Sequence, residues 1–161
     1  GDQLVGGHGN AVLSDDGTGI ARLSGDAGDD TLTLTNYDSS IDVIDGGAGT
    51  DTLVVDRTGS TSWQFNMGTS AAQSGGVIYY NWTTANTVAN FSGIENISVS
   101  GSNILYVYAN NANNVITGGS TGSDQIDYRN AIGGVSVNLQ TGEVTGGSGN
   151  DTLVGIEHVG A

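Results

Sequence analysis

The chain has 161 residues and carries 17 acidic against 3 basic side chains, a formal charge of −14. This excess of negative charge argues against binding to nucleic acid or to an anionic membrane surface, and it opposes compaction unless cations are bound. There are 28 Gly, no Pro and no Cys, which excludes disulfides and cysteine-based zinc sites. Glycine at more than twice its usual share of about 7% predicts many tight turns.

Short apolar runs alternate with Gly- and Asp-rich segments through the first third of the chain. The apolar runs predict β-strands at residues 12–13, 21–23, 31–35, 41–44 and 52–55. Gly-rich turns start at Gly6, Gly25 and Gly46, at intervals of 19 and 21 residues. Two strands and two turns in each interval predict an all-β fold, a flattened right-handed parallel β-roll or β-solenoid.

Two segments of the chain interrupt this pattern. Residues 55–92 separate Gly93-Ile94-Glu95 from the strand before it, whereas Gly155-Ile156-Glu157 directly follows its strand. We therefore expect residues 55–92 to be looped out as an aromatic-rich insertion. Residues 129–145 are a second excursion, and their alternating pattern predicts a hairpin. Further strands are expected at 97–99, 104–108 and 115–117.

Five turns share a nine-residue pattern, G-G-x-G-x-D-x-U-x, in which U is a large apolar residue. The copies that begin at Gly46 and Gly146 match at every position. The copy at Gly25 has Asp26 for the second Gly, and the copy at Gly118 carries one inserted residue. In the copy at Gly6, Ala11 replaces the Asp, which leaves Asn10 as the alternative donor there.

This pattern resembles the repeat of the RTX, or hemolysin-type calcium-binding, family of Gram-negative bacteria. The resemblance implies a parallel β-roll in which calcium lies between adjacent turns, and export by type I secretion. Calcium prefers six to eight oxygen ligands, which carboxylates and the carbonyls of Gly-rich turns can supply. On this resemblance, residues 1–161 form a single calcium-binding module that folds as it takes up Ca²⁺, cut from a longer repeat protein.

The calcium ligands that the resemblance implies fall into three groups. The repeat carboxylates are Asp30, Asp51, Asp124 and Asp151. The turn carbonyls are those near Gly25, Ala27, Gly47, Gly49, Gly147 and Gly149. A further site on the opposite edge would use Asp2, Asp15 and Asp16.

Catalysis is not expected in this chain. His8 and His158 are isolated, and the H-E-x-x-H pattern of zinc proteases is absent. One G-x-S-x-G match begins at Gly118, but it lies in a repeat turn and no helix pattern follows it. The strand–turn–helix setting of a nucleophile elbow is therefore missing.

Two interpretations of the aromatic residues in segment 55–92 remain open. The rings can pack against the strands as a local core. Alternatively, some stay exposed and stack on a sugar or dock a partner. The candidates for such a ligand platform are Trp82, Tyr80 and Trp63.

The leading hypothesis is a calcium-stiffened structural module of a secreted or cell-surface bacterial protein, of adhesin or S-layer type. Its expected partners are calcium ions and the neighbouring repeats of the parent chain, with self-association or a surface polysaccharide as further candidates. Neither nucleic acid nor membrane insertion is expected. The alternative is an accessory module of a secreted polysaccharide-active enzyme or protease.

Overall fold

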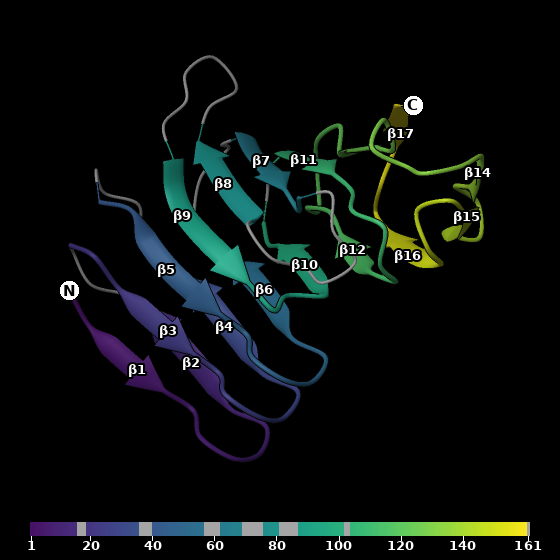
Figure 1. Ribbon diagram of the computed structural model, residues 1–161. Helices are drawn as coiled ribbons and strands as arrows, with labels where there is room; N and C mark the ends of the chain where they lie inside the picture. Colours follow the sequence, from purple (N-terminus) through teal and green to yellow (C-terminus); the bar gives the residue numbers. More distant parts are fainter. Residues whose placement is uncertain are drawn as a thin grey trace.

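The computed structural model describes residues 1–15, 19–35, 40–56, 62–68, 76–80, 87–101 and 104–160. Within these ranges the chain forms seventeen short β-strands and no helix (Figure 1). No segment of the described chain is therefore a helix with the length and apolarity needed to cross a bilayer. The prediction of an all-β fold is confirmed.

The strands form two sheets. The nine-stranded sheet has the spatial order β1-β3-β5-β9-β8-β7-β11-β13-β17. Its strands are β1 (Gln3–Val5), β3 (Arg22–Ser24), β5 (Asp42–Asp45), β7 (Ser62–Asn66), β8 (Gly76–Tyr80), β9 (Thr87–Ser92), β11 (Ile104–Tyr108), β13 (Gln125–Asp127) and β17 (His158–Gly160).

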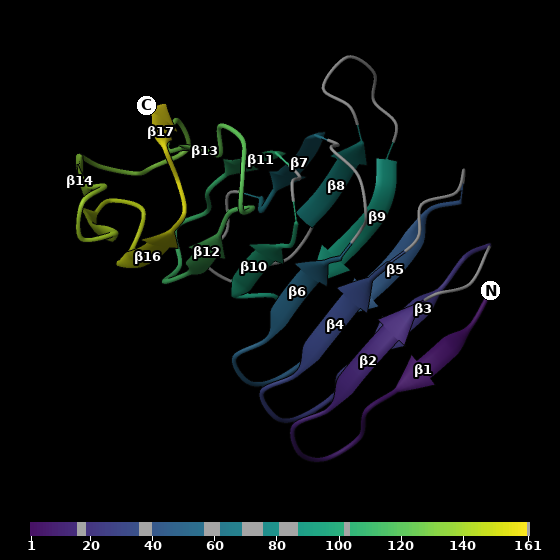
Figure 2. The same ribbon diagram turned by 180° about the vertical axis from the view of Figure 1, so that it is seen from behind.

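The eight-stranded sheet has the order β14-β15-β16-β12-β10-β6-β4-β2. Its strands are β2 (Val12–Asp15), β4 (Thr31–Leu34), β6 (Thr52–Val55), β10 (Asn96–Val99), β12 (Val115–Thr117), β14 (Val135–Asn138), β15 (Glu143–Gly146) and β16 (Asp151–Val154). In the views from the two opposite sides, one sheet lies in front of the other (Figures 1 and 2).

Successive strands alternate between the two sheets from β1 to β6, and again from β9 to β13. Strands that are neighbours within each sheet along these stretches pair in parallel. The predicted parallel strands are therefore confirmed. Each stretch of 19 to 21 residues between successive Gly-rich turns adds one strand to each sheet, and this brings the turns into register.

The core lies between the sheets and consists of aliphatic rows in register. One row crosses the eight-stranded sheet through Leu13, Leu32, Leu53, Ile97, Ile116 and Leu153. Five of these six pack at 6% exposure or less, and Leu13 is 9% exposed. Each such side chain contributes about 1.5–3 kcal/mol by leaving water, and the U position of the repeat supplies most of the row.

The described strands of segment 55–92 belong to the nine-stranded sheet, whereas the sequence predicted a looped-out insertion. Its strands β7, β8 and β9 form an antiparallel meander inside the nine-stranded sheet. The meander pairs in parallel with β5 through β9 and with β11 through β7. Within the nine-stranded sheet, β1, β3 and β5 lie on one side of the meander, and β11, β13 and β17 lie on the other (Figures 1 and 2). The alternating apolar pattern of the meander explains why it joins the sheet, because its inward-facing side chains continue the apolar face of the neighbouring strands.

The described aromatic rings of the meander belong to the core. Trp63 is 2% exposed and Phe65 is fully buried. The rings of Phe65 and Phe91 meet edge to face, with their centroids 6.5 Å apart. Trp63 is therefore not part of an exposed ligand platform. Trp82 lies outside the described residues, and so does the side chain of Tyr80.

The predicted hairpin at residues 129–145 corresponds to strands β14 and β15, which pair antiparallel with each other and end at Gly146. Strand β15 also pairs antiparallel with β16, so the hairpin extends the eight-stranded sheet beyond its parallel part. Val144 is buried at 1% exposure, and Val135 and Val137 pack against the core. The hairpin thus covers one end of the strand array.

Gly46 offers a test of how closely the turns stack. A Cβ at this position would lie 1.9 Å from the carbonyl oxygen of Gly93 and 2.7 Å from Asp51 Oδ2. We expect Gly46→Ala to lower the free energy of unfolding by about 3 kcal/mol, since two backbones would have to separate. Chemical denaturation measures this loss.

Gly134→Ala is the matched control. A Cβ at Gly134 would meet nothing within 4 Å, so the substitution should leave stability unchanged or raise it by up to about 1 kcal/mol through the unfolded state. Equal stabilities for the two variants would contradict the stacking geometry.

Candidate metal site in the stacked turns

The turns lie on two edges of the sheet pair. The first edge is the row of turns that leads into the eight-stranded sheet, and it contains the motifs that begin at Gly6, Gly25 and Gly46. The motif at Gly146 joins two strands of that sheet and stacks on the same edge, where Asp151 accepts the N–H of Asn114. The second edge is the row of turns that leads back to the nine-stranded sheet, and it contains the motif at Gly118. Asp30, Asp51 and Asp151 are thus brought to one edge, and Asp124 lies on the other.

The repeat carboxylates hold neighbouring backbone segments together. Asp30 Oδ1 accepts the N–H of Ala11 at 2.7 Å, and Asp51 Oδ1 accepts the N–H of Asp30 at 2.8 Å. Asp151 Oδ1 accepts the N–H of Asn114 at 3.0 Å. On the second edge, Asp124 Oδ1 accepts the N–H of Leu105 at 2.6 Å. In this way one oxygen of each repeat carboxylate satisfies a backbone donor of the preceding layer.

The second carboxylate oxygen separates the four residues into two classes. Asp151 Oδ2 accepts the hydroxyl of Tyr128 at 2.9 Å. The carboxylate of Asp124 also receives the backbone N–H of Gly119. Asp30 Oδ2 and Asp51 Oδ2, in contrast, are buried and have no hydrogen-bond partner. An unpaired buried carboxylate oxygen is costly, so these two neighbouring turns are where a cation would stabilise the fold most.

The charges around Asp51 also favour a cation at this position. Burial raises the pKa of Asp51, and repulsion from the Glu95, Asp30 and Asp29 carboxylates raises it further. Within the described ranges, the one ion pair joins Arg129 to Asp127 at 2.6 Å, so it does not offset these charges. The first edge therefore concentrates negative charge that no described basic side chain neutralises.

Burial has the same effect on the pKa of Asp124 and on that of Asp151. Burial raises the pKa of Asp124, with a further contribution from the Glu157 carboxylate. Burial also raises the pKa of Asp151 to about 6, although the hydrogen bonds from Tyr128 and Asn114 act in the opposite direction.

The turn carbonyls predicted as ligands are close to neighbouring backbones. The Ala27 carbonyl accepts the N–H of Gly9 at 2.6 Å, and the Gly147 carbonyl accepts that of Ile132 at 3.1 Å. Each carbonyl oxygen keeps a second lone pair. A Cβ on Gly25 would lie 2.2 Å from Asp30 Oδ2. The orphaned oxygen therefore lies against the backbone at the start of its own turn.

The outer turn positions form a second set of contacts between turns. Asn10 Oδ1 accepts the N–H of Asp29, and Asp29 Oδ1 accepts the N–H of Thr50, both at 2.9 Å. Asn10 is therefore engaged in this exposed row and does not take the place of the carboxylate that Ala11 lacks.

The predicted second-edge site includes a residue outside the described ranges, so it stays a prediction. Asp2 is exposed ahead of β1, Asp15 is buried at the end of β2, and Asp16 lies outside the described residues. Among the described residues, no three Asp, Glu or His side chains converge as a metal site. A cation at Asp30 and Asp51 would therefore also need carbonyl oxygens of the turns.

Sequence reasoning missed two carboxylates, Glu95 and Glu157. Glu95 Oε2 accepts the N–H of Asp51 at 2.6 Å, and Glu157 Oε2 accepts the N–H of Asp124 at 2.8 Å. Both belong to a Gly-Ile-Glu sequence. That repeated sequence is the signal that could have identified them.

Comparison with known proteins gives no family assignment. No protein-family model, no curated protein and no solved structure matches the chain.

The raised pKa of Asp151 predicts how stability depends on pH. The pKa of Asp151 in the folded state is about 6, above the ordinary 3.8, so the metal-free folded state holds the proton more tightly than the unfolded state does. The contribution of Asp151 to the free energy of unfolding is then favourable at low pH, and it is lost as the pH rises from about 4 to about 6. We expect Asp151→Asn to flatten this loss and to raise stability at pH 7 by on the order of 2 kcal/mol.

Asp127→Asn is the control of opposite sign. The Arg129 guanidinium lowers the pKa of Asp127 to about 2, so its contribution is present above pH 4 and is lost as the pH falls toward 2. Asp127→Asn should therefore weaken the fold at pH 7. Chemical denaturation at several pH values in EGTA measures both effects, and a less stable Asp151→Asn at pH 7 would contradict the assignment.

Proposed function

We propose that this chain is a calcium-stiffened structural module of a secreted or cell-surface bacterial protein, built as a right-handed parallel β-roll of the RTX type. The observation that carries the proposal is the pair of buried, unpartnered oxygens Asp30 Oδ2 and Asp51 Oδ2 in adjacent turns. Calcium is the ion suited to them, because it accepts carboxylates and carbonyls in irregular geometry.

The strand arrangement supports the β-roll part of the proposal. Strands alternate between two facing sheets, and successive turns stack at nearly equal intervals. The turns also pair directly, through bridges from His8 to Ala27 and from Ala27 to Ala48. A stack of this kind is the expected product of a nine-residue repeat in which each copy supplies one turn and one strand.

The residues that would hold the ion are Asp30, Asp51 and carbonyl oxygens of their turns. Bound calcium supplies the positive charge that the described side chains around Asp51 lack. Its binding energy is then part of the folding energy, because the ligands meet only when the turns stack. We infer that the module stays loosely folded at low calcium and becomes rigid after export, where calcium is abundant.

Calcium removal tests this function directly. Extracellular calcium modules typically bind with Kd of about 10⁻⁴ to 10⁻³ M. At ten to a hundred times Kd, each filled site adds roughly 1.4–2.7 kcal/mol to the free energy of unfolding. We expect circular dichroism in millimolar calcium to show a β spectrum with a raised melting temperature, and EGTA to lower that temperature strongly. Magnesium should not replace calcium, and identical melting curves in calcium and EGTA would refute the proposal.

Matched variants can separate the contributions of individual carboxylates to calcium binding. Asp51 is fully buried, whereas Asp45 is exposed on the outer face and accepts the Ser92 hydroxyl at 2.9 Å. Asp51→Asn keeps an acceptor for the Asp30 N–H but removes a charged ligand, so calcium stoichiometry or affinity should fall. Asp45→Asn should bind calcium as the wild type does. Calorimetric titration measures both, and equal losses in the two variants would contradict the ligand assignment.

A further inference from the structure

Two short turns with the same sequence lie on opposite edges of the molecule. Gly93-Ile94-Glu95 stacks on the turn of Asp51 at the first edge, and Gly155-Ile156-Glu157 stacks on the turn of Asp124 at the second. In both, the glycine has a positive φ, 59° at Gly93 and 62° at Gly155. Ile94 and Ile156 are both buried.

The hydrogen bonds of the two turns are also equivalent. Each Glu accepts the N–H of the facing Asp, at 2.6 Å for Asp51 and 2.8 Å for Asp124. Each Asp carbonyl in return accepts the N–H of that Glu, at 3.2 Å for Glu95 and 3.0 Å for Glu157. The two turns are therefore a matched pair in backbone structure, and any functional difference must come from their surroundings.

Their surroundings differ in how the facing Asp is satisfied. At the second edge, the Asp124 carboxylate receives the N–H groups of Leu105 and Gly119. At the first edge, Asp51 is fully buried and its Oδ2 has no hydrogen-bond partner. The Asp30 carboxylate in the next turn also has an unpartnered oxygen. At the first edge, Glu95 is therefore added next to carboxylates that have an unpartnered oxygen. At the second edge, Glu157 is added next to a carboxylate that has hydrogen-bond partners.

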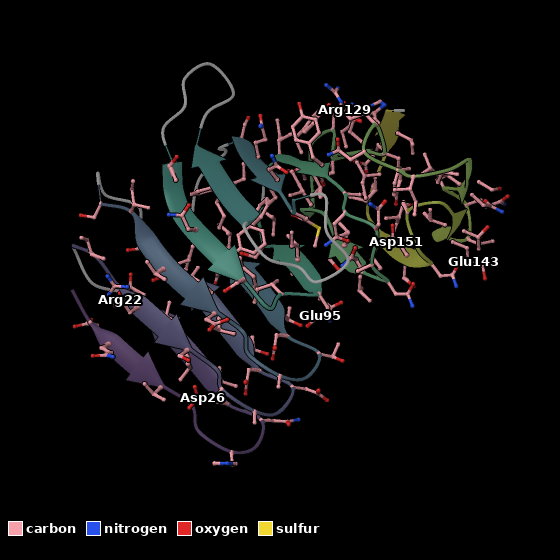
Figure 3. The ribbon with its side chains drawn as sticks, in the orientation of Figure 1. Arg22, Asp26, Glu95, Arg129, Glu143 and Asp151 are labelled. Atoms are coloured by element: carbon pink, nitrogen blue, oxygen red, sulfur yellow. The ribbon has the colours of Figure 1, made fainter. Side chains whose placement is uncertain are left out.

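We propose that Glu95 is a ligand of a calcium ion bound with Asp51, whereas Glu157 only accepts the backbone hydrogen bond at Asp124. This inference rests on the proposed calcium function and adds a ligand from outside the nine-residue repeat. Figure 3 shows Glu95 on the same edge as Asp26, which belongs to the turn that carries Asp30. The carboxylates at this ion are then those of Asp51 and Glu95, and turn carbonyls or water complete the donor set, as calcium accepts.

Glutamine variants separate the ligand role from the hydrogen-bonding role. Glu95→Gln and Glu157→Gln each keep a side-chain oxygen that can accept the same N–H, and each removes one negative charge. We would titrate the wild-type chain and both variants with calcium chloride by calorimetry, with magnesium chloride as the control ion. Thermal melting in EGTA reports whether the metal-free folds are equivalent.

The two variants should differ in calcium binding alone. Glu95→Gln should lose one bound ion or weaken affinity about tenfold or more, since calcium affinity follows the charge of the ligands. Glu157→Gln should bind as the wild type does, and all three proteins should melt alike in EGTA. Unchanged binding by Glu95→Gln, or equal losses in both variants, would overturn the inference.

Two other outcomes are also decisive. If Glu95→Gln is unfolded in EGTA, the calcium titration still decides: one ion fewer or a tenfold weaker affinity supports the ligand role, and the full number of ions at unchanged affinity refutes it. If the wild type binds no calcium, the proposed function fails before any variant is compared, and the inference fails with it. Calcium binding by the wild type together with unchanged binding by Glu95→Gln removes only the role of Glu95.

Discussion

The hydrogen bond from a backbone N–H to the Asp carboxylate of the next turn is the interaction on which the rest of this structure depends. Parallel strands leave the donors of their turns unpaired, and buried donors must find an acceptor. The repeat places an Asp at that point, and adjacent strands lie about 4.8 Å apart. Each added layer therefore brings another buried negative charge close to the one before it. The hydrogen bond that joins the turns thus also places like charges near one another, which costs electrostatic energy.

The chain offsets this cost differently in different layers. Tyr128 donates its hydroxyl to Asp151, and a backbone N–H of Gly119 reaches Asp124. Asn114 stands where an Asp would otherwise be, and its neutral amide donates to the Glu95 carbonyl at 2.7 Å. Only Asp30 and Asp51 are left with an unpartnered oxygen among the described repeat carboxylates. Under the proposed function, a bound cation is therefore needed only in these two layers, as expected for a chain with few tandem repeats.

Local sequence patterns predicted the parts of the fold that depend on local residues. The strands around Leu32, Leu53 and Ile116 follow from their apolar positions, and the turns between them follow from Gly and Asp. The incorporation of β7, β8 and β9 could not be predicted in this way, because their partners β5 and β11 are set by long-range pairing. The role of Glu95 was hidden for the same reason, since its partner Asp51 lies 44 residues earlier.

The position of the meander explains why the uncompensated charge gathers on one edge. On the eight-stranded side, β6 pairs directly with β10, so the turn of Glu95 stacks on that of Asp51 despite the long segment between them. The first edge is therefore continuous from Ala11 through Asp30 and Asp51 to Glu95.

On the other side, three strands separate β5 from β11. The second-edge bonds consequently form two separate groups, one from Ala21 to Asp42 and one from Leu105 through Asp124 to Glu157. Like charges raise one another's electrostatic cost most when their layers are adjacent, because repulsion weakens with distance. The insertion therefore limits the accumulation of charge on the second edge and leaves the first edge as the place where a cation has the most to stabilise.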